Sequence, residues 1–148
     1  MVRVPLVPVP AGQPHVLIPL ELIAPSPVQG LSVTVSVDPR WLRYEGVELT
    51  GIPGAQLLVK DTHAADGSVG LLIALPTGAP LPPGRHQIAT LRFALREPVP
   101  ATGLAVSLTA AVVAREVVDG QGHPLPARYE AGRVIPTGRR RAAIHSMQ

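Results

Sequence analysis

The residues that could bind a metal are histidines and aspartates, and they are scattered along the chain. The five histidines are His15, His63, His86, His123 and His145. None of them forms a pair at the spacing of metal ligands, which favours solvated histidines in loops and at strand starts. Asp61 and Asp66-Gly67 match part of a calcium loop, but the alternating oxygen ligands and the closing glutamate are absent. The sequence therefore predicts no metal site and no cofactor.

Two further patterns contain residue types that can serve in catalysis. Glu45 and Glu48 are three residues apart, but in a strand they fall on opposite faces, where they could not act on one bond. The segment Gly67-Ser68-Val69-Gly70 lacks the residue order of a nucleophile elbow. No glycine-rich phosphate loop precedes a helix. The sequence therefore predicts a protein that is not an enzyme.

Composition limits the class of protein and of partner. The chain has 148 residues, of which 46% are hydrophobic and 16% charged. This length and this hydrophobic content are sufficient for one folded domain with a core. Without cysteines it can form no disulfide. Aromatic residues make up only 3%, which argues against a carbohydrate surface of stacked rings.

Charge and hydropathy exclude two other partners. The net charge is +3, and the three arginines at 139–141 account for it. A nucleic-acid surface needs basic residues spread over a folded face, so this distribution argues against one. No apolar run reaches the ~18–20 residues of a membrane span.

The stretch from Gly30 to Asp38 predicts a strand with one buried and one solvent-facing side. Apolar residues at 31, 33, 35 and 37 alternate with small polar residues at 32, 34, 36 and 38. This period of two with β-branched residues is typical of a strand packed on a core. Pro39 ends the strand because it lacks an amide hydrogen. We expect Trp41 and Leu42 to close one end of the core.

Similar signals recur along the chain, separated by proline and glycine turns. The predicted strands are Val2–Val9, His15–Leu22, Gly30–Val37, Gly46–Leu49, Ala55–Lys60, Ser68–Leu75, Gln87–Leu95, Leu104–Val118 and Arg128–Ile135. Imperfect alternation at Ile88 predicts a bulge. The run Leu104–Val118 is long enough for a helix, but its alternation and paired valines favour a strand. Nine strands predict an all-β sandwich or jelly roll over residues 1–136, followed by a flexible basic tail at 137–148.

The order of several short phrases resembles a cohesin module, the domain by which cellulosomal scaffold proteins and related surface proteins capture dockerin domains. The phrases are Ala11-Gly12-Gln13 before Val16–Leu20, the segment 30–39 ending in Asp-Pro, Gly67–Ala74, Ile88–Phe93, and 119–126 followed by Gly132–Ile135. The resemblance covers the chain from Val2 to Ile135.

The resemblance implies a nine-stranded jelly-roll sandwich that serves protein–protein interaction. It implies a helical dockerin partner that carries its own calcium, and a place outside the cell or at its surface, in a cellulosome or in cell adhesion. The partner would lie on the sheet that contains the third, fifth, sixth and eighth strands. On that sheet, strand alternation predicts a flat outward face with little charge. The predicted contact residues are Ser32, Thr34, Ser36, Leu72, Ala74, Ser107 and Thr109.

One departure from the family leaves other interpretations open. Many cohesins carry acidic or amide side chains where this sequence has Ser32, Thr34 and Ser36. The chain could therefore be a structural spacer in a larger surface or secretion protein. A carbohydrate-binding module is a third interpretation, which rests on fold analogy alone.

Overall fold

The computed structural model describes residues 1–137 and places most of them in strands. The strands are β1 (Val2–Arg3), β2 (Leu6–Pro10), β3 (His15–Ala24), β4 (Gly30–Ser36), β5 (Leu42–Leu49), β6 (Gln56–Lys60), β7 (Ser68–Ala74), β8 (Gly84–Leu95), β9 (Leu104–Thr109), β10 (Glu116–Val118), β11 (Tyr129–Glu130) and β12 (Gly132–Thr137). The helical structure in this range is one 3₁₀ turn, η1 (Ala64–Asp66). It has neither the length nor the apolar character for crossing a membrane.

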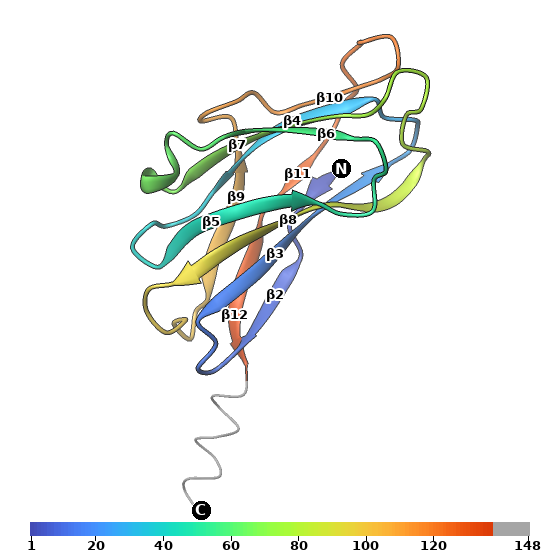
Figure 1. The fold of residues 1–148 in the computed structure, drawn as a ribbon. Coiled ribbons are helices and arrows are strands. Elements are labelled where there is room, and N and C mark those ends of the chain that lie inside the picture. The colour runs from blue at the N-terminus through green and yellow to red at the C-terminus, as the bar shows by residue number, and fades with distance from the viewer. Residues whose placement is uncertain (138–148) are drawn as a thin grey trace, which may run out of the picture.

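The strands form two sheets that pack as a sandwich, as Figure 1 shows. One sheet has the order β11-β1-β3-β8-β5. The other has the order β2-β12-β9-β4-β7-β6, with β10 paired to β4 beside β9. Strands from opposite ends of the chain are neighbours, because β1 pairs with β11 and β2 with β12, both in parallel. The predicted third, fifth, sixth and eighth strands therefore do lie in one sheet.

The inner faces of the two sheets meet in a single core. Alternating residues on three central strands are at most 3% exposed: Val33, Val35, Leu71, Ile73, Leu91 and Phe93. Leu42 is 1% exposed, and the half-buried Trp41 packs against the same core. The alternation read from the sequence thus identifies the buried face correctly, and Trp41 with Leu42 closes the core as predicted.

All nine predicted strands are present, and three of them are divided. The first becomes β1 and β2, which lie in different sheets; the eighth becomes β9 and β10; the ninth becomes β11 and β12. Strand rather than helix is confirmed for Leu104–Thr109. β12 runs to Thr137, and the rest of the predicted tail, 138–148, lies outside the described residues.

Two bulges adjust the β3-β8-β5 ladders. Leu20 pairs with Ala89 and Glu21 with Gln87, so Ile88 is the extra residue, where the sequence predicts a bulge. On β5, the pairing shifts between Tyr44 and Gly46, which leaves Glu45 as the extra residue. A bulge can redirect a side chain, and this one brings Glu45 to the outer face that also carries Glu48 and Arg92. The expectation that Glu45 and Glu48 lie on opposite faces is therefore wrong.

Candidate protein-interaction face

The outer face of β6, β7, β4 and β10 consists of aligned rows of outward residues. The ladder register gives a first row of Gln56, Ala74, Gly30 and Val118, and a second row of Leu58, Leu72, Ser32 and Glu116. A third row, Lys60, Gly70, Thr34 and Thr109, continues onto β9. Neighbouring strands are ~4.8 Å apart, so the members of one row are adjacent side chains.

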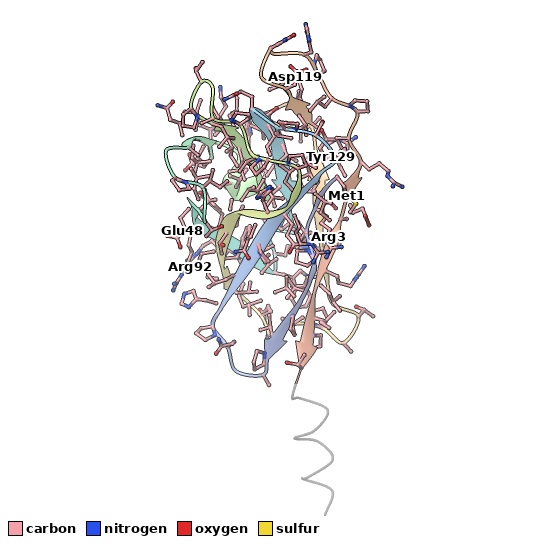
Figure 2. The ribbon with its side chains drawn as sticks, turned by 90° about the vertical axis from the view of Figure 1, so that its right-hand side faces the viewer. Met1, Arg3, Glu48, Arg92, Asp119 and Tyr129 are labelled. Atoms are coloured by element: carbon pink, nitrogen blue, oxygen red, sulfur yellow. The ribbon has the colours of Figure 1, made fainter. Side chains whose placement is uncertain are left out.

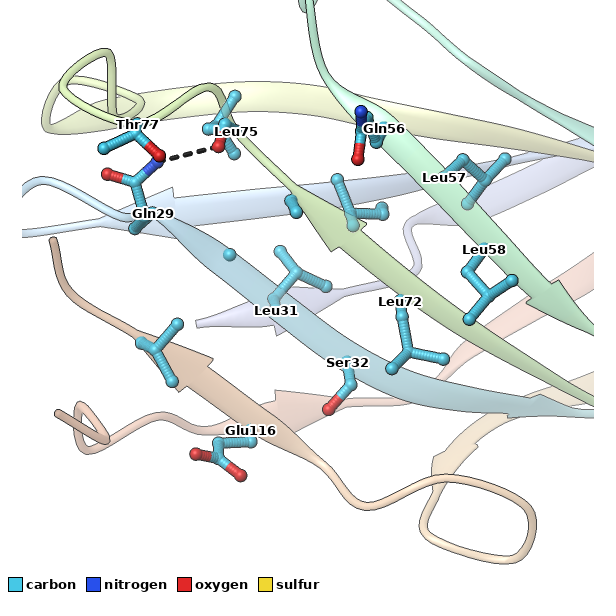
Figure 3. Close-up of a pocket in the computed structure, with 14 residues that line it drawn as sticks. Gln29, Leu31, Ser32, Gln56, Leu57, Leu58, Leu72, Leu75, Thr77 and Glu116 are labelled. Atoms are coloured by element: carbon cyan, nitrogen blue, oxygen red, sulfur yellow. Dashed lines mark hydrogen bonds between the residues drawn. The ribbon is translucent and has the colours of Figure 1, made fainter. Parts of the chain in front are cut away.

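The first two rows line an open hollow of about 910 Å³ on this face, which we call the groove. Figure 3 shows Leu58 on β6, Leu72 on β7 and Ser32 on β4 one after another across the floor of the groove, with Glu116 beyond them. Leu58 is 57% exposed. The Gln29 side chain donates hydrogen bonds of 2.8 Å to the carbonyls of Leu75 and Pro76 and so fixes one end. The groove is apolar along Leu58, Leu72 and Ala74, and its polar lining comes from Gln29, Gln56, Ser32, Thr77 and Glu116.

Residues 110–115 cross the third row as a strap between β9 and β10. The Thr34 hydroxyl accepts hydrogen bonds from the backbone N–H of Val112 (3.1 Å) and Val113 (2.9 Å) and donates one to the Val113 carbonyl (2.9 Å). The Ser32 hydroxyl donates to the Ala114 carbonyl at 2.7 Å. Gly70 leaves room for the strap, since a Cβ there would lie 2.9 Å from Val113 Cγ1.

The strap divides the seven predicted contact residues into two groups. Ser32, Leu72 and Ala74 line the groove. The expectation that Thr34 faces solvent is wrong, because the strap covers this side chain and leaves it 0% exposed.

The other three predicted contact residues lie on the covered side of the face or beyond it. The hydroxyls of Ser36 and Thr109 bond each other at 2.9 Å, and Ser36 also bonds Ser68 at 3.1 Å, so these hydroxyls already have partners within the chain. Half-buried Ser107 lines a separate shallow hollow beside Trp41. A contact role for any of the seven residues stays a prediction.

The structure adds groove residues that sequence reasoning missed. Leu58 and Gln56 have the outward parity of β6, a signal that was present in the sequence. Glu116 and Val118 reach the groove only because β10 pairs with the first half of β4. Nothing in the local sequence of residues 116–118 indicates that pairing.

The opposite sheet carries a compact cluster of charges. The carboxylate of Glu45 lies 3.0 Å from Arg92 Nε, 3.3 Å from His15 Nε2 and 3.5 Å from Arg43 Nη2. The hydrogen bond from Arg92 lowers the pKa of Glu45 below its usual value, and the neighbouring cations add to the effect. Figure 2 shows Arg92 and Glu48 beside each other at this edge of the molecule. Glu45 and its basic neighbours thus satisfy one another within the chain.

Residues 1–137 contain no group of three histidine, aspartate or glutamate side chains that could hold a metal ion. The carboxylate of Asp119 instead accepts backbone hydrogen bonds of 2.9 Å from His123 and Gln121. These bonds hold its pKa below the usual range. The arrangement is that of a turn whose amides are capped by a side chain.

Comparison with protein-family models and with curated protein sequences finds no match. Solved structures do match over nearly the full chain. The sixth cohesin of scaffoldin B from Acetivibrio cellulolyticus, determined with a Cel5 dockerin mutant, is 19% identical with a TM-score of 0.74, covering 91% of this chain and 96% of that chain. The non-cellulosomal cohesin from Archaeoglobus fulgidus is 13% identical with a TM-score of 0.75, covering 100% and 98%.

A third match is the seventh ScaB type I cohesin from Pseudobacteroides cellulosolvens, 16% identical with a TM-score of 0.70 and coverage of 92% and 90%. TM-scores of 0.70 to 0.75 establish the fold, while identities of 13% to 19% leave the partner open. The chain therefore has the fold of cohesin modules, a jelly-roll β-sandwich, as its sequence predicts.

Proposed function

We propose that this chain is a non-catalytic interaction module that docks a dockerin-type partner, a helical domain loaded with calcium. The observation that carries the proposal is the cohesin fold over the whole described chain, with a relative of that fold determined in complex with a dockerin. Such a module would act outside the cell or at its surface. The calcium would belong to the partner, so the module itself would need no cofactor.

The groove supplies the physical basis for docking. Leu58 and the half-buried Leu72 lie side by side on β6 and β7, with Ala74 next to them. Complete burial of an exposed leucine side chain is worth about 1.5–3 kcal/mol. An apolar centre with a polar rim is the usual composition of a protein interface. The proposal therefore places the centre of contact in the groove, with Ser32, Leu72 and Ala74 retained from the predicted residues.

The test is calorimetric titration of the folded chain with a panel of dockerins, with calcium and with chelator. We expect calcium-dependent binding to at least one dockerin. Leu58→Arg should weaken that binding by about tenfold or more, because it places a charge beside Leu72 in the apolar part of the groove. Leu17→Arg is the matched control, since Leu17 is also 57% exposed but lies on β3 in the opposite sheet.

The outcomes separate fold from function. Binding that Leu58→Arg and Leu17→Arg weaken equally would contradict the assigned face. A complete absence of calcium-dependent binding across the panel would reject the dockerin partner, while leaving the fold unchanged.

A structural spacer is the second candidate, and the strap is the observation that favours it. By covering Thr34, the strap removes part of the face from any partner. A spacer would keep its role when the groove is blocked. Incorporation of the Leu58→Arg variant into its native assembly at the wild-type level would support the spacer and contradict docking.

A further inference from the structure

We propose that the groove accepts one short amphipathic helix lying across the strands, with a basic residue of the helix facing Glu116 and an acidic residue facing Lys60. This inference rests on the proposed docking function and specifies the chemistry of the partner. The inference follows from the width that the strap leaves open, from the length of the groove over four strands, and from the charges of Glu116 and Lys60.

The strap limits the face to the width of one helix. Only the first two rows are open between β6 and β10, because Val112 and Val113 lie over Gly70 and Thr34 in the third row. Two rows on one face of a strand are ~7 Å apart. A helix with its side chains is ~10 Å wide, and packed helices lie 8–10 Å apart. A second helix would therefore have to displace the strap.

The length of the groove sets the length of the helix. The groove extends over four strands in the order β6, β7, β4 and β10. Three spacings of ~4.8 Å give about 14 Å. At 1.5 Å per residue, this distance corresponds to about nine or ten residues, between two and three turns. Leu58 at the β6 end and Leu72 beside it on β7 match the apolar stripe of such a helix.

Opposite charges lie at the two ends of the exposed face, Glu116 within the groove and Lys60 next to it in the third row. Glu116 on β10 is exposed and lines one wall, while exposed Lys60 continues the outward side of β6 beyond Leu58. Neither forms an ion pair with another residue in the range 1–137. Arg115 does not neutralise Glu116, because its guanidinium donates to the Leu108 carbonyl at 3.0 Å and lies over the Tyr129 ring. Charges arranged in this way select partners of complementary pattern.

The test uses stapled helical peptides of twelve residues that share one apolar stripe and differ at their ends: Lys with Glu, Glu with Glu, and Lys with Lys. Binding is followed by ¹H–¹⁵N chemical shifts of the protein. We expect the Lys/Glu peptide to shift the amides of Leu58, Leu72 and Glu116 and to bind about threefold to tenfold more tightly than the other two. Doubling the helix length should tighten binding by less than about twofold.

Charge substitutions make the assignment specific. Glu116→Lys should transfer the preference to the Glu/Glu peptide, and Lys60→Glu to the Lys/Lys peptide. Glu48→Lys, on the opposite sheet, should leave the order of affinities unchanged. Equal affinities, shifts centred on residues 110–115, or no shifts in the groove would each overturn the inference.

The result is distinguishable from the outcome for the proposed function. Dockerin binding together with peptides of equal affinity would reject the charged helix site and retain docking. The expected peptide order without any dockerin binding would retain the helix site and reject the dockerin as partner.

Discussion

The Thr34 hydroxyl uses its full hydrogen-bonding capacity on the strap. A hydroxyl has one donor and two acceptor positions, and Thr34 fills all three with the backbone of Val112 and Val113. The Thr34 hydroxyl thus serves as the acceptor for two backbone amides, those of Val112 and Val113, that have no carbonyl partner in a sheet. It therefore acts as an anchor inside the chain.

Replacing Thr34 by valine tests this role. Valine keeps the shape but leaves the Val112 and Val113 amides without their acceptor, so we expect a loss of about 1–3 kcal/mol in the free energy of unfolding. Hydrogen exchange at these two amides should accelerate more than exchange across the core. Thr90→Val is the control, because Thr90 on β8 is half-buried and its hydroxyl only accepts from the Gln87 side chain. Equal losses in the two variants would contradict the anchoring role.

The Glu45 cluster predicts a component of stability that acid removes. The hydrogen bond from Arg92 places the pKa of folded Glu45 below the usual 4.5. A lowered pKa in the folded state stabilises the fold above the unfolded pKa, and this gain disappears as the pH falls through the folded pKa. The stability difference between wild type and Glu45→Gln should therefore shrink between pH 6 and pH 2.5, as measured by thermal unfolding.

Arg92→Gln should remove the largest part of the same acid-sensitive component, because it removes the hydrogen-bond donor while His15 and Arg43 stay near Glu45. The double variant should then differ little from Glu45→Gln alone. Full additivity of the two substitutions at pH 7 would show that Glu45 and Arg92 do not interact.

At the level of elements, the sequence predicts the strands well, but it does not predict which outward-facing residues another segment covers. Alternation from Gly30 to Ser36 correctly separates the buried valines from the outward hydroxyls, because side-chain direction depends on the backbone period alone. Whether another segment lies above an outward residue depends on tertiary structure. The five residues 110–114, all alanine or valine, interrupt the alternation of Leu104–Val118, and this was the local sign that the strand divides there.

The turn from η1 into β7 depends on a glycine. Gly67 has a φ of +89°, and a Cβ there would collide with the Val37 carbonyl; its own carbonyl accepts from Val37 N–H at 2.8 Å. This contact fixes the start of β7 against the end of β4. The turn thereby supports the register of the two strands that form the floor of the groove.

Gly67→Ala should lower the free energy of unfolding by more than Gly12→Ala. Both glycines have positive φ, where another residue costs about 1–3 kcal/mol, but a Cβ at Gly12 meets open space. The collision at Gly67 should add about 1–3 kcal/mol. Chemical denaturation of both variants measures the difference. Equal losses would mean that the turn adjusts without disturbing β4.

At the scale of the whole molecule, the N-terminal segment holds the two sheets together. β1 pairs with β3 and β11 in one sheet, and β2 pairs with β12 in the other. Gly132, at the start of β12, lets this crossing segment approach, since a Cβ there would collide with Val4 and the Pro5 carbonyl. The sequence predicts a single strand here because alternation continues through Val4-Pro5. The change of sheet follows from long-range pairing, which a local pattern does not contain.

Deleting residues 1–10 should therefore abolish folding. The segment contributes four valines that are at most 8% exposed: Val2, Val4, Val7 and Val9. At about 1.5–3 kcal/mol each, their burial is worth about 6–12 kcal/mol, comparable with the total stability of about 5–15 kcal/mol of a typical domain. Leu6→Ser, at a residue 62% exposed on the same segment, should change stability by no more than about 0.5 kcal/mol. A cooperative thermal transition of the deletion variant near the wild-type temperature would show that the remaining strands close the sandwich without this segment.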